Sequence, residues 1–495
     1  MLLLLTMWTP DAAAYGEKVH ARLTQEALGR AIGTTVVTPA TAEQVGTLLG
    51  DIDTYARTNP AIAPRWAERY PLPERVFDAW ELKQLLMLSP DATVYGIDRF
   101  DPDTDRVALV SVSARRPDDD FRNRDRFAHN ADRTPIANTP DDPVILNMGK
   151  LGALSSQAHA HYGLDQLEFS EDPKVLQEDP PRFAVPAGWP DGPVLTFAAE
   201  MCQAHLDLAT LAALNGYDGL ATSFTGQAFH YLEDVGNPIH TVQVGLYDFF
   251  KDAFFQRLAI SLFTGGGHFG ELPTLGSIGI GILSNHHTIS EQLTEKKMLA
   301  GEQRLLTAMT TDDANFLARL PTDNTGEFGI AATRALIKAS APDGAPMYAA
   351  TRAITHPRYR KWKVSFDDKN DDPEAALKPG ATPAEMETFW ALQVSSLGRA
   401  GTALRRVWSL QEAFIADART SPEATAAARQ VVLGRMLGRT LDLQASADTR
   451  RAKYRANPPP PDNAPPKQTG VLVGEAVAGS VLLGGIAWGV RRRKQ

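Results

Sequence analysis

Cysteine is almost absent from this sequence. Cys202 is the single cysteine among 495 residues, so a monomer can form neither an internal disulfide nor a multi-cysteine zinc ribbon or iron–sulfur cluster. Any metal ion would have to be held by histidines and carboxylates. Positive charge is also in deficit, because 50 Lys and Arg stand against 59 Asp and Glu and the net charge is −9. This balance gives no general attraction to polyanionic DNA or RNA and disfavours a basic-groove nucleic-acid binder.

Several common catalytic signatures are missing as well. The sequence contains no Walker loop, GxSxG elbow or HExxH, so the usual P-loop nucleotide-binding, serine-hydrolase and zincin interpretations lose their support. With 43% hydrophobic residues, the chain is apolar enough to fold around at least one sizeable core. Most of the sequence between 17 and 454 has helical periodicity, which predicts an all-α fold. A β-branched alternation at 107–112 predicts one inserted hairpin.

The C-terminal region predicts a membrane anchor. Residues 470–490 carry Glu475 as their only charge, and about 21 residues at roughly 1.5 Å each can cross a hydrocarbon core of about 30 Å. A proline-rich linker at 458–469 precedes this expected transmembrane helix, and a basic tail at 491–495 follows it. The positive-inside tendency places the tail in the cytoplasm and the body of the protein outside it.

The N-terminus is consistent with export. Residues 1–14 begin with a short apolar run and end in three alanines, which suits cleavage of a signal peptide, although no basic residue precedes the run. Cleavage after Ala14 would make Tyr15 the first residue. We therefore expect an exported protein of the cell envelope, with a body at 15–300 and a helical extension at 301–457 outside the cytoplasm.

Histidines and carboxylates recur at helical spacing. In the segment AFHYLEDVGNPIH, His230 and Asp234 are four residues apart and project from the same face of a predicted helix. The Gly-Asn-Pro that follows ends this helix, and the turn can bring His240 back beside that face. In the segment NHHTISE, His287 and Glu291 form a second pair with the same spacing. Imidazoles and carboxylates are the ligands expected of zinc when thiolates are absent.

The order of these motifs resembles that of the bacterial zinc-dependent phospholipase C and fungal single-strand nuclease superfamily. Four short segments carry the resemblance, at 15–20, 117–129, 230–240 and 287–291. The resemblance implies a compact multi-helix bundle at 15–300, with three zinc ions at the bottom of a cleft. It also implies hydrolysis of phosphodiesters or phosphomonoesters.

Residue by residue, the resemblance implies that the amine and carbonyl of Tyr15 chelate one zinc, together with His20. Tryptophan is usual at this first position, but the chelate uses the backbone, so tyrosine should still serve. His230 and Asp234 would bind a close pair of ions, with Asp234 bridging them. The implied ligands of the remaining zinc are His240, His287 and Glu291.

An upstream acid and an upstream histidine complete the implied ligand set. The segment at 117–129 offers Asp118, Asp119 or Asp120 together with His129, and Asp118 is favoured, followed by Asp119. This acid can both bind metal and orient or deprotonate the attacking water, so Asp118 and Asp119 are the candidate catalytic residues. The alternative histidines are His159 and His161.

A close pair of metal ions suits the hydrolysis of phosphate esters. Ions about 3.5 to 4 Å apart can share a bridging hydroxide and neutralise charge on the phosphoryl oxygens. The resemblance thus predicts about three zinc ions per chain and a phospholipase C-type phosphodiesterase acting on a phospholipid or another phosphodiester. One alternative is a single-strand-specific nuclease of the same superfamily. The other is a non-enzymatic, surface-anchored helical binding protein with structural metal.

Overall fold

The computed structural model describes residues 17–32, 35–38, 41–69, 105–115, 117, 163, 198–241, 275–324, 326–361, 364–367 and 370–456. The regular elements in these ranges are all helices, and their only β-pairing consists of two isolated bridges. The all-α prediction is therefore confirmed for this part of the chain. Within these ranges no helix has the length and hydropathy of a membrane span. The expected signal peptide, linker, transmembrane helix and basic tail lie outside the described residues.

The described helices have these bounds: α1 (Glu17–Ile32), α2 (Ala42–Thr58), α3 (Ala63–Arg69), α5 (Arg106–Ser113), α9 (Ala198–Leu214), α10 (Asp218–Gly236), η4 (Pro238–His240), α12 (Leu275–Leu299), α13 (Gln303–Thr310), α14 (Ala314–Leu317), α15 (Phe328–Ser340), η6 (Ala341–Asp343), α16 (Gly344–Ile354), η7 (Pro357–Arg360), α17 (Pro383–Ala418) and α18 (Pro422–Ala456).

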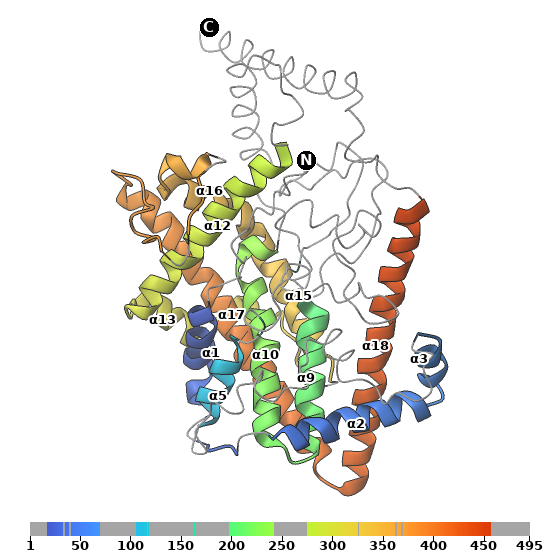
Figure 1. The fold of residues 1–495 in the computed structure, drawn as a ribbon. Coiled ribbons are helices and arrows are strands. Elements are labelled where there is room, and N and C mark those ends of the chain that lie inside the picture. Colours follow the sequence, from blue (N-terminus) through green and yellow to red (C-terminus); the bar gives the residue numbers. More distant parts are fainter. Residues whose placement is uncertain are drawn as a thin grey trace.

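Helix α10 lies at the centre of this arrangement (Figure 1). Every residue from Gly219 to Gly236 is buried, and the helix contacts α1, α5, α9, α15 and α17. Two glycines permit the closest of these approaches. A Cβ at Gly226 would lie 2.3 Å from the carbonyl oxygen of Val110 on α5, and one at Gly236 would lie 2.8 Å from Cβ of Ala400 on α17. Larger residues at these positions would push α5 or α17 away from α10.

Helix α17 extends for 36 residues along the core. Its start is well specified, because Thr382 and Glu385 form a reciprocal capping box and Pro383 occupies the first turn. Apolar residues of α17, such as Leu397 and Leu404, share one hydrophobic cluster with residues of α1, α9, α10, α13 and α15. Helices α13, α15 and α17, all after residue 301, therefore pack on the same core as α1, α9 and α10.

The hairpin expected at 107–112 is wrong, because these residues form helix α5. The Asp105 side chain accepts hydrogen bonds from the backbone N–H groups of Val107 and Ala108, which caps the helix. The helix packs against both α1 and α10, so Val107, Leu109 and Val110 are all buried. Apolar residues are thus needed around much of the circumference of α5, and the apparent period of two arises from this burial.

Candidate metal centre

The first group of candidate ligands comprises His20, His230 and Asp234, called here the first triad. His20 lies on α1, and the other two residues lie one turn apart on α10. All three side chains are fully buried, and one donor atom from each lies within 4.8 Å of the others. The structure therefore places His20 beside His230 and Asp234. The pair was predicted from helical spacing, whereas His20 was predicted only from the family resemblance.

Two hydrogen bonds orient the imidazoles of this triad. Nδ1 of His230 is 2.7 Å from the carbonyl oxygen of Ala114, and Nδ1 of His20 is 2.7 Å from Oε2 of Glu233. Because a backbone carbonyl can only accept, Nδ1 of His230 carries the N–H and the neutral ring presents a lone pair at Nε2. An N–H at Nδ1 of His20 that donates to Glu233 leaves a lone pair at Nε2 of His20 in the same way. Helix α5 ends at Ser113, and its terminal carbonyl groups have no partners within the helix, so that of Ala114 can accept from His230.

The carboxylate of Asp234 faces both rings through different oxygens. Oδ1 is 3.4 Å from Nε2 of His20, and Oδ2 is 3.3 Å from Nε2 of His230. Lone pairs on the nitrogens thus face lone pairs on the oxygens, an arrangement that a cation between them stabilises. Asp234 thus directs one carboxylate oxygen toward each imidazole.

The second group, called the second triad, comprises His240 on η4 with His287 and Glu291 on α12. Nε2 of His287 is 2.9 Å from Nε2 of His240 and 2.6 Å from Oε1 of Glu291. Nε2 of His240 is 3.6 Å from the same carboxylate oxygen. All three residues are buried, so three donor atoms converge on one point away from bulk water.

Asn237 connects the end of α10 to the second triad. Its amide Nδ2 donates to Oε1 of Glu291 at 3.0 Å, while its Oδ1 accepts from the backbone N–H of Ile239 at 3.2 Å. The second bond caps η4, which begins at Pro238 and ends at His240. The Gly-Asn-Pro sequence therefore both ends α10 and orients a ligand, as the predicted return of His240 requires.

Burial keeps one imidazole of each triad neutral. Removal from water lowers the pKa of His230 to about 3, an effect that the Ala114 hydrogen bond opposes and nearby His205 reinforces. Burial likewise lowers the pKa of His287 to about 4. At neutral pH both rings therefore have the unprotonated nitrogen that metal binding needs.

Glu233 is a functional candidate that sequence reasoning missed. It is fully buried beside the first triad and bonds both His20 and Thr24. Burial raises the pKa of Glu233 well above its usual value, and the Thr24 hydrogen bond acts in the opposite direction. One sequence signal was available, because Glu233 directly precedes Asp234 in an otherwise apolar stretch of the helix.

Comparisons with known proteins return no match. Neither a family model, nor a curated protein, nor a solved structure matches this chain. The functional assignment therefore depends on the geometry of the two triads.

The remaining sequence candidates lie outside the described residues. These are Tyr15, Asp118, Asp119, Asp120, His129, His159 and His161. Of the described candidates, the structure gathers His20, His230 and Asp234 in one triad and His240, His287 and Glu291 in the other.

The donor sets fit a divalent transition metal. Each triad supplies two neutral imidazole nitrogens and one carboxylate oxygen, which is the ligand chemistry of catalytic zinc sites with three protein ligands and an open position. A buried cluster that lacked a cation would instead leave an ionised carboxylate facing neutral rings at high desolvation cost. The two triads could therefore each hold a metal ion.

Proposed function

We propose that this protein is a zinc-dependent hydrolase of phosphate esters, with a fold of the phospholipase C and single-strand nuclease type. The observation that supports this most strongly is the position of Asp234 between two imidazoles, because a shared carboxylate is how a close pair of ions is held. The second triad, on η4 and α12, would hold a further ion, and the family resemblance brings the proposed count to about three per chain. Phospholipase C-type cleavage of a phosphodiester is the proposed activity.

The described residues would bind and orient the reacting groups. Bound zinc would supply a water that ionises near neutral pH and positive charge for the phosphoryl oxygens. His230 and Asp234 hold their ligand atoms on one face of a fully buried helix, which leaves them little freedom to move. His240, His287 and Glu291 fix a second cationic position. Asp118 is proposed to orient or deprotonate the attacking water, with Asp119 as the alternative.

A phospholipid or another phosphodiester is the proposed substrate. The net charge of −9 gives no general attraction to a nucleic acid. The apolar segment at 470–490, proposed as the membrane anchor of an exported protein, would keep the hydrolase close to lipid. Cleavage of single-stranded nucleic acid and purely structural metal binding are the competing outcomes of the test.

The test uses the full chain, purified in mild detergent and loaded with zinc. Phosphatidylcholine, a chromogenic phosphodiester and single-stranded nucleic acid are offered separately, and we expect cleavage of the first two. Asp234→Asn and His287→Ala should lower the rate by more than the roughly 10–100-fold typical of groups that only support a ligand. Matched controls are Asp442→Asn, at an exposed pair with Arg65, and His356→Ala, a histidine that belongs to neither triad.

Three outcomes contradict the proposal in different ways. Preferential cleavage of single-stranded nucleic acid would assign a nuclease. Bound zinc without cleavage of any of the three substrates would assign a structural metal site. Activity that survives both ligand substitutions would remove the two triads from the reaction.

A further inference from the structure

Glu233 is a buried carboxylate that touches the first triad without belonging to it. It directly precedes Asp234 on α10, and its side chain is fully buried. We infer that Glu233 is a positioning residue, which holds His20 in the orientation and tautomer that a metal ion requires. This inference rests on the proposed metal-dependent function and concerns a residue that the ligand set does not include.

Both oxygens of Glu233 are bonded to α1. Oε2 is 2.7 Å from Nδ1 of His20, and Oε1 accepts from the hydroxyl of Thr24 at 2.5 Å. Thr24 follows His20 by four residues, so the two side chains project from the same face of α1. The carboxylate is therefore held at two points, and it can in turn fix the plane of the His20 ring.

The tautomer of His20 decides whether the triad can receive a cation. With N–H at Nδ1 donating to Glu233, Nε2 offers a lone pair at 3.4 Å from Oδ1 of Asp234. In the opposite tautomer, N–H at Nε2 would point at that oxygen and form a hydrogen bond in place of the metal. Glu233 disfavours this competing arrangement, because its oxygen needs a donor at Nδ1.

The two histidines of the first triad are oriented by different kinds of group. His230 is oriented by a backbone carbonyl, that of Ala114, which carries no net charge. His20 is oriented by a side-chain carboxyl group, which contacts with His20 and Thr24 hold at both oxygens. A substitution at position 233 can therefore remove the partner of His20 and leave that of His230 in place.

Zinc affinity of the full chain provides the test. Zinc content and affinity are measured by competition with a chromogenic chelator for the parent, Glu233→Ala, Glu233→Gln and His20→Ala. From the usual cost of losing such a partner, we expect a fall in affinity of about 100-fold for Glu233→Ala and about 10-fold for Glu233→Gln. Glutamine is less damaging because its carbonyl can still accept from Nδ1 of His20. His20→Ala should lose about one zinc per chain.

A matched substitution on α1 controls for nonspecific effects. Glu26→Gln removes a carboxylate that pairs with Arg22 on a partly exposed face of the same helix, and it should leave zinc affinity unchanged. Thermal unfolding with and without zinc adds a second readout. If Glu233 only joined α1 to α10, Glu233→Gln would lower the midpoint of the zinc-free protein and leave zinc affinity as in the parent.

The failures are distinguishable. A parent that binds no zinc overturns the proposed function itself. A parent that binds zinc, with unchanged affinity in folded Glu233→Gln or Glu233→Ala and a loss in His20→Ala, overturns the positioning role alone.

Discussion

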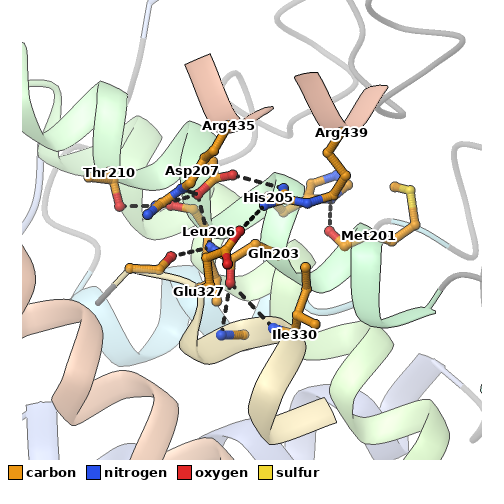
Figure 2. Close-up of polar contacts among 12 residues, drawn as sticks. Met201, Gln203, His205, Leu206, Asp207, Thr210, Glu327, Ile330, Arg435 and Arg439 are labelled. Carbon is orange, nitrogen blue, oxygen red and sulfur yellow. Dashed lines mark hydrogen bonds and ion pairs between the residues drawn. The ribbon is translucent and has the colours of Figure 1, made fainter. Parts of the chain in front are cut away.

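Two polar clusters on neighbouring helices, each built around a buried aspartate, use carboxylates in opposite ways. The first is the first triad with Glu233. The second, called the Asp207 cluster, consists of Gln203, Asp207, Glu327, Arg435 and Arg439. Figure 2 shows Arg435 and Arg439 reaching from α18 to Asp207 on α9. Both clusters bury an aspartate completely, but they oppose it with different partners.

The Asp207 cluster is neutral and its contacts are donor to acceptor. Asp207 accepts from Nε2 of Gln203 at 2.9 Å, from Nε of Arg435 at 2.8 Å and from Nη1 of Arg439 at 3.1 Å. Arg439 also donates to Glu327 at 3.2 Å. Two carboxylates are thus balanced by two guanidinium groups, and the cluster ties α18 to α9 without any added ion.

In the first triad Asp234 faces two imidazole rings, and burial keeps that of His230 neutral. The pKa of His230 is lowered to about 3, so at neutral pH this ring gives Asp234 no positive charge. The comparison teaches that a buried carboxylate paired with cationic N–H donors is already balanced in charge, whereas one beside neutral rings can serve as a ligand for a cation. The type of partner therefore distinguishes the two clusters, although the aspartate is buried in both.

The largest expected effect comes from a substitution that disrupts the Asp207 cluster. Asp207→Ala leaves two mostly buried guanidinium groups without their main acceptor, and loss of one partner from such a cluster costs about 3–5 kcal/mol in the free energy of unfolding. The measurement is urea unfolding, with and without zinc. Glu387→Gln, at the exposed pair with Arg304, is the control and should cost far less, because solvent screens that pair. A loss below 1 kcal/mol at Asp207 would assign it to the same weak class as this surface pair.

Metal removal gives the next largest effect and acts on the other cluster. Zinc that binds only the folded state adds about 2.7 kcal/mol when its free concentration is 100 times Kd, and a chelator removes this increment. In Asp207→Asn, the molecules that still fold should keep the added stability that zinc gives, because the Asp207 cluster lies outside both triads. Asp234→Asn should reduce the increment. An unfolding midpoint of the parent that does not respond to chelator would contradict metal binding by the triads.

The smallest effect is a dependence on pH in the zinc-free protein. His287 has its ordinary pKa of 6.5 when unfolded, and burial lowers this pKa to about 4 in the fold. As pH falls below about 6.5 the unfolded chain takes up a proton that the folded chain does not, so stability falls until about pH 4. The slope is at most about 1.4 kcal/mol per pH unit for one histidine.

Urea unfolding in chelator at pH 7, 6 and 5 measures this dependence, and the difference between two proteins isolates one group. His287→Gln should show a shallower loss of stability on acidification than the parent. Equal slopes in the two proteins would mean that His287 is not held neutral by burial.

The sequence allowed prediction of those features that arise within one helix. The pairs His230 with Asp234 and His287 with Glu291 follow from a spacing of four residues, and the Gly-Asn-Pro turn accounts for His240. Spacing along the sequence could not show which residues of different helices lie together, so His20 was predicted from the family resemblance alone. The expectations for Tyr15, Asp118, Asp119 and His129 remain predictions.

The supporting groups were missed because their roles are tertiary. Glu233 acquires its partner from α1, more than 200 positions away, and His230 is oriented by a backbone carbonyl at the end of α5. That carbonyl could not be expected from a segment interpreted as a hairpin. The misassignment of 107–112 therefore also concealed the acceptor that sets the tautomer of His230.

The tight packing around α10 has a consequence for how this sequence can change. Gly226 and Gly236 lie where neighbouring helices leave no volume for even a methyl group, and the residues between them have no solvent-facing side. During evolution, insertions in loops and substitutions on the outer surface could therefore accumulate while the sequence of this segment changed little. Similarity to a distant relative would then persist in this segment after the rest of the chain had diverged.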